Sequence, residues 1–470
     1  MAAVVAAGAL VVGGWRWLEY RREATVIRWL RDHAIVHRTI DPAAELTDLQ
    51  PVGNAIGEAR IVGVGEATHG TREHSLYKHR LLRYLVTEKG FRALAFESPW
   101  PTGLDLNQYV LGGDGDPVRL LGRAVFGVWH TDEVLEMVRW MREYNATVAR
   151  DQRVEFVGID HQLTRESARA VADYLGRVDS QLRADHWATL ALLQEKEIEG
   201  LYFEVVDNER RLRDAATTRP ISAAVRTIRT RFDTERERYI VASSTDEFDL
   251  ARQHATILVQ QADVSAAPDP ADRDRYMADN LDWYLARRPT AKIMIWAHNG
   301  HVDTRVERAA LGRHLRNRHG QDYVSVGFVL GSGAYRALDA RNAPRGSHRY
   351  SSATFAFGPP PAGTIDALLA RTGYRVFAVD LRPARGAVRE FLDRPIGIRK
   401  GAGIVGVDDD PLATVKRSLP STHDLLIYID PTTPARAIVR RSSANSRFQP
   451  TQPAAAFFRV RYHLACGLRS

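Results

Sequence analysis

The sequence predicts an α/β protein with a mainly parallel central sheet flanked by helices in three layers (α/β/α). A helical insertion is expected to form a lid over the carboxyl ends of the strands. Two observations predict this fold. Short apolar runs end on acidic or histidine residues, and each is followed by turn residues and a helical pattern. The region from about 164 to 285 has helical patterns and almost no strand-like runs. The apolar runs are IVGVGEATH (61–69), ALAFES (93–98), VEFVGIDH (154–161) and KIMIWAH (292–298).

The first segment, residues 1–24, is set apart from the domain that follows over residues 25–441. Residues 1–15 carry no charge and precede the basic stretch RWLEYRRE. The segment is short for a membrane span and lacks the basic start of a signal peptide. Membrane association through residues 1–18, export and a start site placed too early all stay open. The sequence VIRWLRDHAIV, from Val26, is expected to form the first helix of the domain.

The first strand and the helix after it are predicted in most detail. Glu66 ends the strand, Gly65 and Gly70 are expected to turn the backbone sharply, and Thr71 is expected to cap the helix. His69 then lies in the loop between strand and helix. The core-facing stripe of that helix is Tyr77, Leu81, Tyr84 and Leu85.

The later elements continue this pattern. After the helical insertion, the sheet resumes at KIMIWAH and continues with DYVSVGFVLG, RVFAVDL and HDLLIYID. The tail over residues 442–470 is polar and rich in serine, proline and alanine, so we expect it to be disordered.

Acidic and histidine residues at the strand ends form the candidate site. In open parallel sheets, ligands bind outside the carboxyl ends of the strands, so these side chains should face one crevice. The residues are Glu66, His69, Glu97, Asp160, His161, His298 and His301.

Composition excludes several classes of function. The net charge of +8 is mild for 470 residues, no long basic run occurs, and no nucleic-acid-binding motif is present. The single cysteine, Cys466, excludes an intrachain disulfide and a cysteine-based metal site. A cytoplasmic location is the expectation, with membrane anchoring or export as the alternatives.

Several blocks of the chain resemble the erythromycin esterase family. They are GEATHGTREH…K…GFRALAFES, VWHTDEV…WMREYN, VGIDHQ, RDRYMADN and AHNGHV, spread from about Trp29 to about Val439. The resemblance implies an α/β hydrolase in which water attacks the substrate without a covalent intermediate. It implies that His69 is the essential histidine, with Glu66 as its partner.

The resemblance also places the acidic residue after the next strand at Glu97 and the later histidines at His298 and His301. Macrolide-resistance members of the family have an arginine nine residues after the essential histidine, where this chain has Lys78. Lysine is a point charge without the bidentate fork of arginine. The lysine therefore weakens the expectation of macrolide specificity and leaves the expected active site unchanged.

The residues themselves favour a water-activating mechanism. No GxSxG nucleophile motif occurs. A histidine beside a carboxylate can act as a general base on water, with Glu66 orienting His69. His298, with His301 or Lys78, would stabilise the oxyanion or protonate the leaving group. We therefore expect an esterase or lactone hydrolase without a cofactor, whose substrate is a macrolide-like or other secondary metabolite.

Further residues are expected to contact the substrate. Arg273 belongs to a helical RDxxMxxN pattern, in which the neighbouring Asp274 is expected to form an internal salt bridge. The predicted substrate contacts are Lys78, Trp129, Glu133, Asp160, His161, Arg273 and His301.

Two alternatives use the same residues. The pairs Glu66/His69 and His298/His301, with Glu97 and Asp160, could bind Zn²⁺ or Mn²⁺ in a metal-dependent hydrolase. A ligand-binding protein without catalytic activity, such as a carrier or an accessory protein of polysaccharide assembly, could also be built on this fold.

Overall fold

The main sheet has eight strands in the part of the chain that the computed structural model describes. That part is residues 2–438 except 196, 199–210, 213–214, 267–269, 340, 342–350, 402–403 and 406–412. In spatial order the strands are β1 (Ile35–Val36), β11 (Val376–Asp380), β15 (Leu425–Ile429), β8 (Tyr323–Leu330), β2 (Ile61–Val64), β7 (Ile293–Trp296), β3 (Ala93–Pro99) and β4 (Glu155–Asp160).

Strand directions confirm the mainly parallel sheet. The neighbours from β15 to β4 all pair in parallel, whereas β11 runs antiparallel to β15, and β1 runs antiparallel to β11. All seven predicted strands form. The two-residue strand β1 lies in the segment HAIV, which was predicted as helix, and this part of the prediction was wrong.

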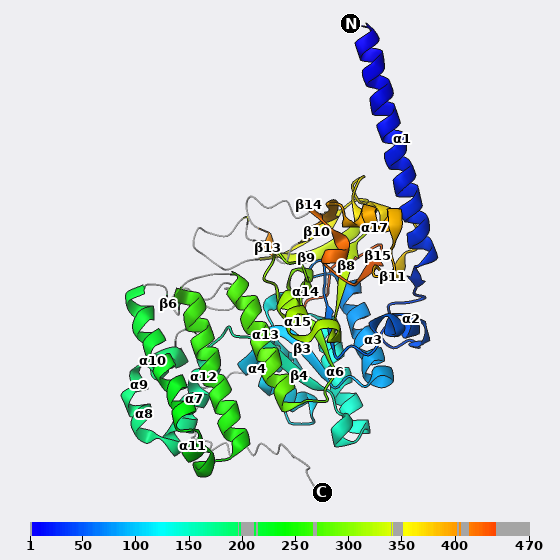
Figure 1. Ribbon diagram of the computed structural model, residues 1–470. Helices are drawn as coiled ribbons and strands as arrows, with labels where there is room; N and C mark the ends of the chain where they lie inside the picture. The colour runs from blue at the N-terminus through cyan, green and yellow to red at the C-terminus, as the bar shows by residue number, and fades with distance from the viewer. Residues whose placement is uncertain are drawn as a thin grey trace, which may run out of the picture.

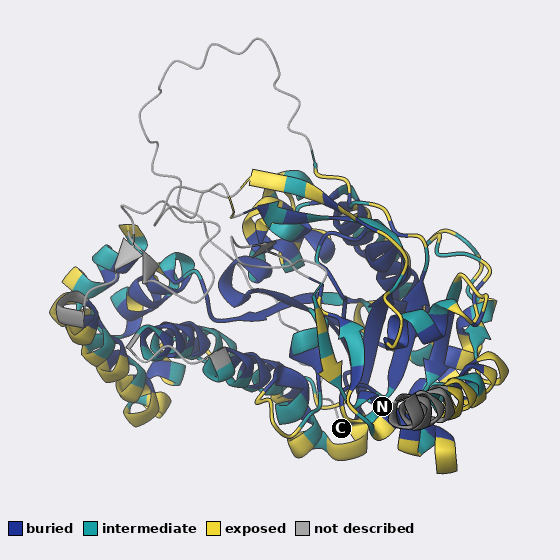
Figure 2. Cartoon of the chain, turned by 90° about the horizontal axis from the view of Figure 1, so that it is seen from above, coloured by how far each residue is buried: buried dark blue, intermediate teal, exposed yellow. Residues whose placement is uncertain are grey.

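Alternate residues of the central strands face opposite helical layers. Val62 and Leu94 pack in the cluster that contains residues of α3 (Arg72–Lys89), α4 (Trp100–Val110) and α6 (Asp132–Thr147). Ile61 and Ala95 pack in the cluster that contains residues of α13 (Pro270–Arg287) and α15 (Leu311–His319). Figure 2 shows the strands in the dark blue of buried residues, with exposed residues on the outer faces of the helices. The three-layer prediction is confirmed.

The helical insertion has a core of its own, shared by α7 (Arg165–Val178), α9 (Trp187–Glu195), α10 (Ala215–Thr234) and α12 (Thr245–Ala266). It lies beside β4 and α4, at the edge of the sheet (Figure 1). Helix α13 leaves this bundle and packs on the sheet, so that its first turn reaches the strand ends. Closure of the insertion over a substrate stays a prediction. The helices are α7 (Arg165–Val178), α8 (Ser180–Asp185), α9 (Trp187–Glu195), α10 (Ala215–Thr234), α11 (Arg236–Ala242), α12 (Thr245–Ala266) and α13.

Helix α1 (Ala2–Asp32) is longer than predicted, because residues 2–25 continue the helix expected from Val26. Its C-terminal part packs against α16 (Ile365–Ala370) and α17 (Gly386–Asp393), and its N-terminal end projects from the body (Figure 1). Among the described residues, no helix is long and apolar enough to cross a membrane.

The predicted tail over residues 442–470 lies outside the described residues.

The remaining elements lie outside the main sheet. These elements are α2 (Gln50–Ile56), α5 (Pro117–Ala124), α14 (Asn299–Val302), a sheet of β10 (Ser351–Phe357), β9 (Gly333–Asp339) and β13 (Ile404–Val405), and the pairs β12 (Ile396–Arg399) with β14 (Thr414–Arg417) and β5 (Glu197–Ile198) with β6 (Arg211–Leu212).

Candidate active site

A buried carboxylate, Glu66, lies directly after β2 and accepts three hydrogen bonds. Its Oε1 accepts from His69 Nδ1 at 2.7 Å and from Trp129 Nε1 at 2.8 Å, and its Oε2 accepts from Lys78 Nζ at 2.6 Å. Burial alone would raise the pKa of Glu66, but the charge of Lys78 and the bond from His69 outweigh it and lower that pKa to about 2. Glu66 is therefore an anion at neutral pH.

Lys78 lies behind Glu66 and away from solvent. Its side chain is fully buried, and its ammonium lies 4.4 Å from the centroid of the Trp296 ring. Burial lowers the pKa of Lys78 to about 8, against the opposing effect of Glu66. The sequence predicts Lys78 as a substrate contact, whereas the structure makes it the counter-ion of Glu66.

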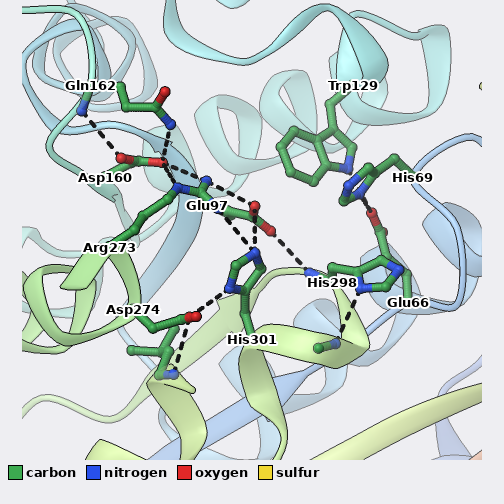
Figure 3. A network of polar contacts seen from close by, with 12 residues as sticks. Glu66, His69, Glu97, Trp129, Asp160, Gln162, Arg273, Asp274, His298 and His301 are labelled. Carbon is green, nitrogen blue, oxygen red and sulfur yellow. Dashed lines mark hydrogen bonds and ion pairs between the residues drawn. The ribbon is translucent and has the colours of Figure 1, made fainter. Parts of the chain in front are cut away.

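His69 is the part of this group that solvent reaches, because its side chain is 17% exposed while those of Glu66 and Lys78 are fully buried. Since Glu66 is ionised, Nδ1 of His69 carries the proton that it donates. Nε2 then has a lone pair, and among the described residues it has no hydrogen-bond partner. The ring lies edge-on to Trp129 and to His298, at centroid distances of 4.5 and 5.1 Å (Figure 3).

The loop that carries His69 is held by close backbone contacts. A Cβ at Gly65 would lie 2.2 Å from Asn299 Oδ1, and one at Gly70 would lie 1.9 Å from the carbonyl oxygen of Arg336. Both glycines were predicted to turn the backbone sharply, but neither has a positive φ. Glycine is needed at both positions because neighbouring segments approach the backbone too closely for a Cβ. Thr71 stands at the helix N-cap position without capping it, because its hydroxyl hydrogen-bonds to that of Thr68. The predicted cap was wrong.

His298 follows β7 and is held as a neutral imidazole. Its Nδ1 accepts from the backbone N–H of Gly300 at 3.1 Å, and its Nε2 donates to the carbonyl of Ala67 at 3.1 Å. Burial, with the neighbouring His69 and His301, lowers the pKa of His298 to about 3. A neutral ring with its proton on Nε2 has a single N–H donor, which here is bonded to the carbonyl of Ala67 beside His69.

Glu97, in β3, is the centre of a second group of polar contacts. It accepts from the backbone N–H of His298 at 3.0 Å and from Arg273 at 3.0 Å, and it pairs with His301 Nε2 at 3.0 Å (Figure 3). The carboxylate is 3% exposed. Although burial opposes ionisation, His301 and Arg273 hold the pKa of Glu97 well below its usual range.

His301, on α14, lies between two carboxylates. Its Nδ1 is 2.5 Å from Asp274 Oδ1, and its Nε2 faces Glu97. Burial would lower the pKa of His301, but Asp274 and Glu97 raise it to about 10. The internal salt bridge predicted for Asp274 is present, and it makes His301 a buried cation.

Arg273 joins α13 to the strand ends. Its Nη2 donates to Asp160 Oδ2 at 2.6 Å and to Glu97 Oε1 at 3.0 Å. Burial would raise the pKa of Asp160, but the charge of Arg273 lowers it. Two groups of polar contacts, one around Glu66 and one around Glu97, thus meet at His298.

The other predicted substrate contacts lie in supporting positions. Glu133 pairs with Arg72 at 3.3 Å and accepts from the backbone N–H of Arg436 at 3.1 Å. His161 Nδ1 lies 2.8 Å from Gln261 Oε1, and both residues are buried. Their contact with a substrate stays a prediction, as does that of Trp129.

Sequence reasoning missed the backbone partners of the site. The carbonyl of Ala67 and the N–H of Gly300 fix the tautomer of His298, and main-chain groups of this kind leave no residue-type signal. The hydrogen bond from Trp129 to Glu66 was also missed. Trp129 lies 63 residues after Glu66 in the chain, and nothing in the sequence distinguishes it from a core tryptophan. In the described part of the chain, no three histidine, cysteine, aspartate or glutamate side chains gather as metal ligands do.

Comparison with known proteins identifies the family. The model of the family described as erythromycin esterase matches residues 86–432, which is most of the chain. The chain belongs to the erythromycin esterase family. It is therefore a hydrolase of the esterase class that acts on a small molecule. The predicted resemblance is confirmed.

Individual relatives of this esterase support the same family assignment. An erythromycin esterase type II of Escherichia coli is 27% identical over 66% of this chain and 78% of its own length. A putative hydrolase of Bacillus subtilis is 25% identical over 73% of this chain and 78% of its own length. A Bacillus cereus protein of known crystal structure has a TM-score of 0.75 and 28% identity, over 89% of this chain and 99% of its own. A mutant erythromycin esterase solved in its open conformation shares the fold, with a TM-score of 0.67 and 17% identity, over 84% of this chain and 97% of its own.

Proposed function

We propose that this esterase hydrolyses an ester or lactone by direct attack of a water molecule that His69 activates. The observation that carries the proposal is the pairing of a partly exposed imidazole, His69, with a buried, ionised carboxylate, Glu66. The pairing leaves Nε2 of His69 as the basic atom of a ring that solvent reaches. A base in this position would take a proton from water as the water attacks the carbonyl carbon.

Glu66 would act on His69 in two ways. Its hydrogen bond to Nδ1 selects the tautomer with a basic Nε2, and its negative charge stabilises the imidazolium that forms when the proton is taken. Lys78 and Trp129 hold the carboxylate in place from the buried side. Because Glu66 accepts hydrogen bonds from three fixed donors, little reorganisation would be needed as the charge on His69 changes.

His298 would stabilise the developing oxyanion. As a neutral ring it offers an N–H at Nε2, which in the absence of substrate donates to the carbonyl of Ala67. Transfer of that hydrogen bond to the substrate oxygen would place a donor beside the attacking water. Glu97 and His301 then fix the backbone and the surroundings of His298 without contacting the substrate.

Water attack is favoured over a covalent intermediate because the nearby hydroxyls are not activated. Thr68 is fully buried and hydrogen-bonds to Thr71. Ser98 is also fully buried, and among the described residues neither hydroxyl hydrogen-bonds to a histidine or another base. A serine or threonine nucleophile needs an adjacent base within hydrogen-bonding distance.

Family membership supports an ester or lactone as the substrate, and one position bears on macrolides in particular. Lys78 stands where macrolide-resistance relatives have arginine, and it fills a fully buried position. We infer a small lactone or ester of the secondary-metabolite type, with the identity of the metabolite to be set by experiment.

The test is a panel of macrolides, simple lactones and aryl esters incubated with purified protein before and after exhaustive treatment with a chelator. The proposal predicts hydrolysis of at least one ester or lactone at an unchanged rate after chelation. Activity lost with the chelator and restored by stoichiometric Zn²⁺ or Mn²⁺ would favour the metal-dependent alternative. Tight binding without turnover across the panel would favour a ligand-binding protein.

A further inference from the structure

Helix α1 divides into two parts of different chemistry. Residues 1–15 contain no charged side chain, whereas residues 16–32 contain both acidic and basic ones. The helix is continuous from Ala2 to Asp32, and its N-terminal end projects from the body (Figure 1). The apolar part therefore lies away from the core of the protein to which the second part is attached.

The second part of α1 is fixed to the body by packing and by ion pairs. Val26, Ile27 and Leu30 are buried in a core cluster shared with α16 and α17. Glu19 pairs with Arg394 at 2.6 Å, and Glu23 pairs with Arg371. Glu19 also lies 3.6 Å from Arg22. Packing and ion pairs thus join the second part of α1 to the body and set the direction in which the apolar part projects.

The side of α1 that faces solvent next to the apolar part is aromatic and basic. Trp17, Leu18 and Tyr20 are 56%, 50% and 62% exposed. Arg21 and Arg22 are exposed as well, and the guanidinium of Arg21 lies 4.8 Å from the centroid of the Trp17 ring. Tryptophan and tyrosine favour the interface between lipid and water, and arginine favours anionic headgroups.

We propose that the apolar turns of α1 insert into a lipid bilayer with anionic headgroups and hold the esterase at the membrane surface. The fourteen residues from Ala2 to Trp15 extend about 21 Å as a helix, less than the ~30 Å hydrocarbon core. Trp17 and Tyr20 lie at the headgroup level, and Arg21 and Arg22 contact the lipid phosphates. The helical backbone satisfies its own hydrogen bonds in lipid, except at its end.

Vesicle flotation of the full chain tests this proposal. Vesicles of phosphatidylcholine alone are compared with vesicles that also contain phosphatidylglycerol, at low and high salt. We expect the protein to float with the anionic vesicles and to bind less at high salt, because exposed charges are then screened. Protein that stays at the bottom of the gradient with both kinds of vesicle contradicts the proposal, and equal binding to both contradicts its anionic part.

Two variants separate the apolar and the basic contributions. Val5→Asp with Leu10→Asp places charges in the apolar turns, outside the packed part of α1. Arg21→Glu with Arg22→Glu reverses the basic patch and should lower the partition coefficient by at least about tenfold, since each basic residue near an anionic surface contributes to binding. The matched control reverses two exposed arginines of the insertion, Arg169→Glu with Arg219→Glu, and should bind like the parent.

Thermal unfolding of each variant shows whether the body is intact. Folded Val5→Asp/Leu10→Asp protein that binds vesicles as the parent does would overturn the insertion of α1. Self-association that depends on residues 2–14 in the absence of vesicle binding would also overturn it, because a second copy of the chain would then be the partner.

Discussion

Glu66 is a buried anion whose charge is balanced by one cation. Lys78 and Glu66 are both fully buried, so the pair lies in a medium where an unbalanced charge is costly. A lysine at this position also makes the balance sensitive to pH, because a buried ammonium loses its proton far more readily than a guanidinium does.

The pH profile of kcat/KM tests the role of Lys78. With a pKa of about 8, Lys78 is charged below that pH and neutral above it, so activity that depends on the balanced Glu66 should fall as pH rises through about 8. In Lys78→Arg, which does not titrate in this range, the falling limb should move to higher pH. A limb that stays near pH 8 in folded Lys78→Arg protein would contradict this role.

His301 gives a second pH dependence, in stability rather than in activity. Its pKa is about 10 in the folded protein and about 6.5 in an unfolded chain. The imidazolium therefore stabilises the fold fully below pH 6.5, and this contribution is lost as pH rises toward 10.

Urea unfolding of the parent and of His301→Gln at pH 6, 8 and 10 measures that contribution. The parent should have the larger free energy of unfolding at pH 6, and the difference between the two proteins should shrink by pH 10. A difference of the same size at all three pH values would show that His301 acts by packing and not by charge.

At the scale of elements, α13 connects the helical insertion to the sheet. Arg273 and Asp274, in its first turns, contact Asp160 of β4, Glu97 of β3 and His301 of α14. These buried charged side chains act beside the apolar packing of α13 on the sheet. The position of Glu97, and through it that of His298, depends on α13.

Arg273→Leu tests the junction against Arg275→Leu, a change two residues further along the same helix. Removing Arg273 leaves buried Asp160 without its cation and Glu97 with His301 alone, which should lower the free energy of unfolding by about 3–5 kcal/mol and reduce kcat. Arg275 is 40% exposed and pairs with Asp272, which is 33% exposed, so its loss should cost less than about 1 kcal/mol. Equal effects of the two changes in urea unfolding and turnover assays would contradict the proposed junction.

The strands and the insertion were predictable because each has its own local pattern. Strands buried on both faces, such as IVGV and IMIW, need an apolar residue or glycine at every position. The sequence therefore shows each of them as a continuous apolar run. The edge strand β1 has two residues and no such pattern. The antiparallel direction of β11 depends on how the chain returns to the sheet, which no local run of residues encodes.

At the scale of the whole molecule, the parallel sheet brings residues far apart in the chain to one edge. Glu66, His69, Glu97 and His298 were predicted to meet because each follows a strand, and the structure brings them together (Figure 3). Which group pairs with which could not be predicted. The burial of Lys78, the neutrality of His298 and the charge of His301 depend on neighbours as far as 219 residues away in the chain.

The central claim is that His69 is the base that activates water, and the turnover of His69→Ala with and without added imidazole tests it most directly. With an ester found in the substrate panel, kcat should fall by at least ~10²-fold, the usual contribution of a general base. Imidazole should restore part of the rate, and the free energy of unfolding should change little, because the ring lies in a loop and is partly exposed. A folded His69→Ala protein with turnover comparable to the parent's would contradict the claim.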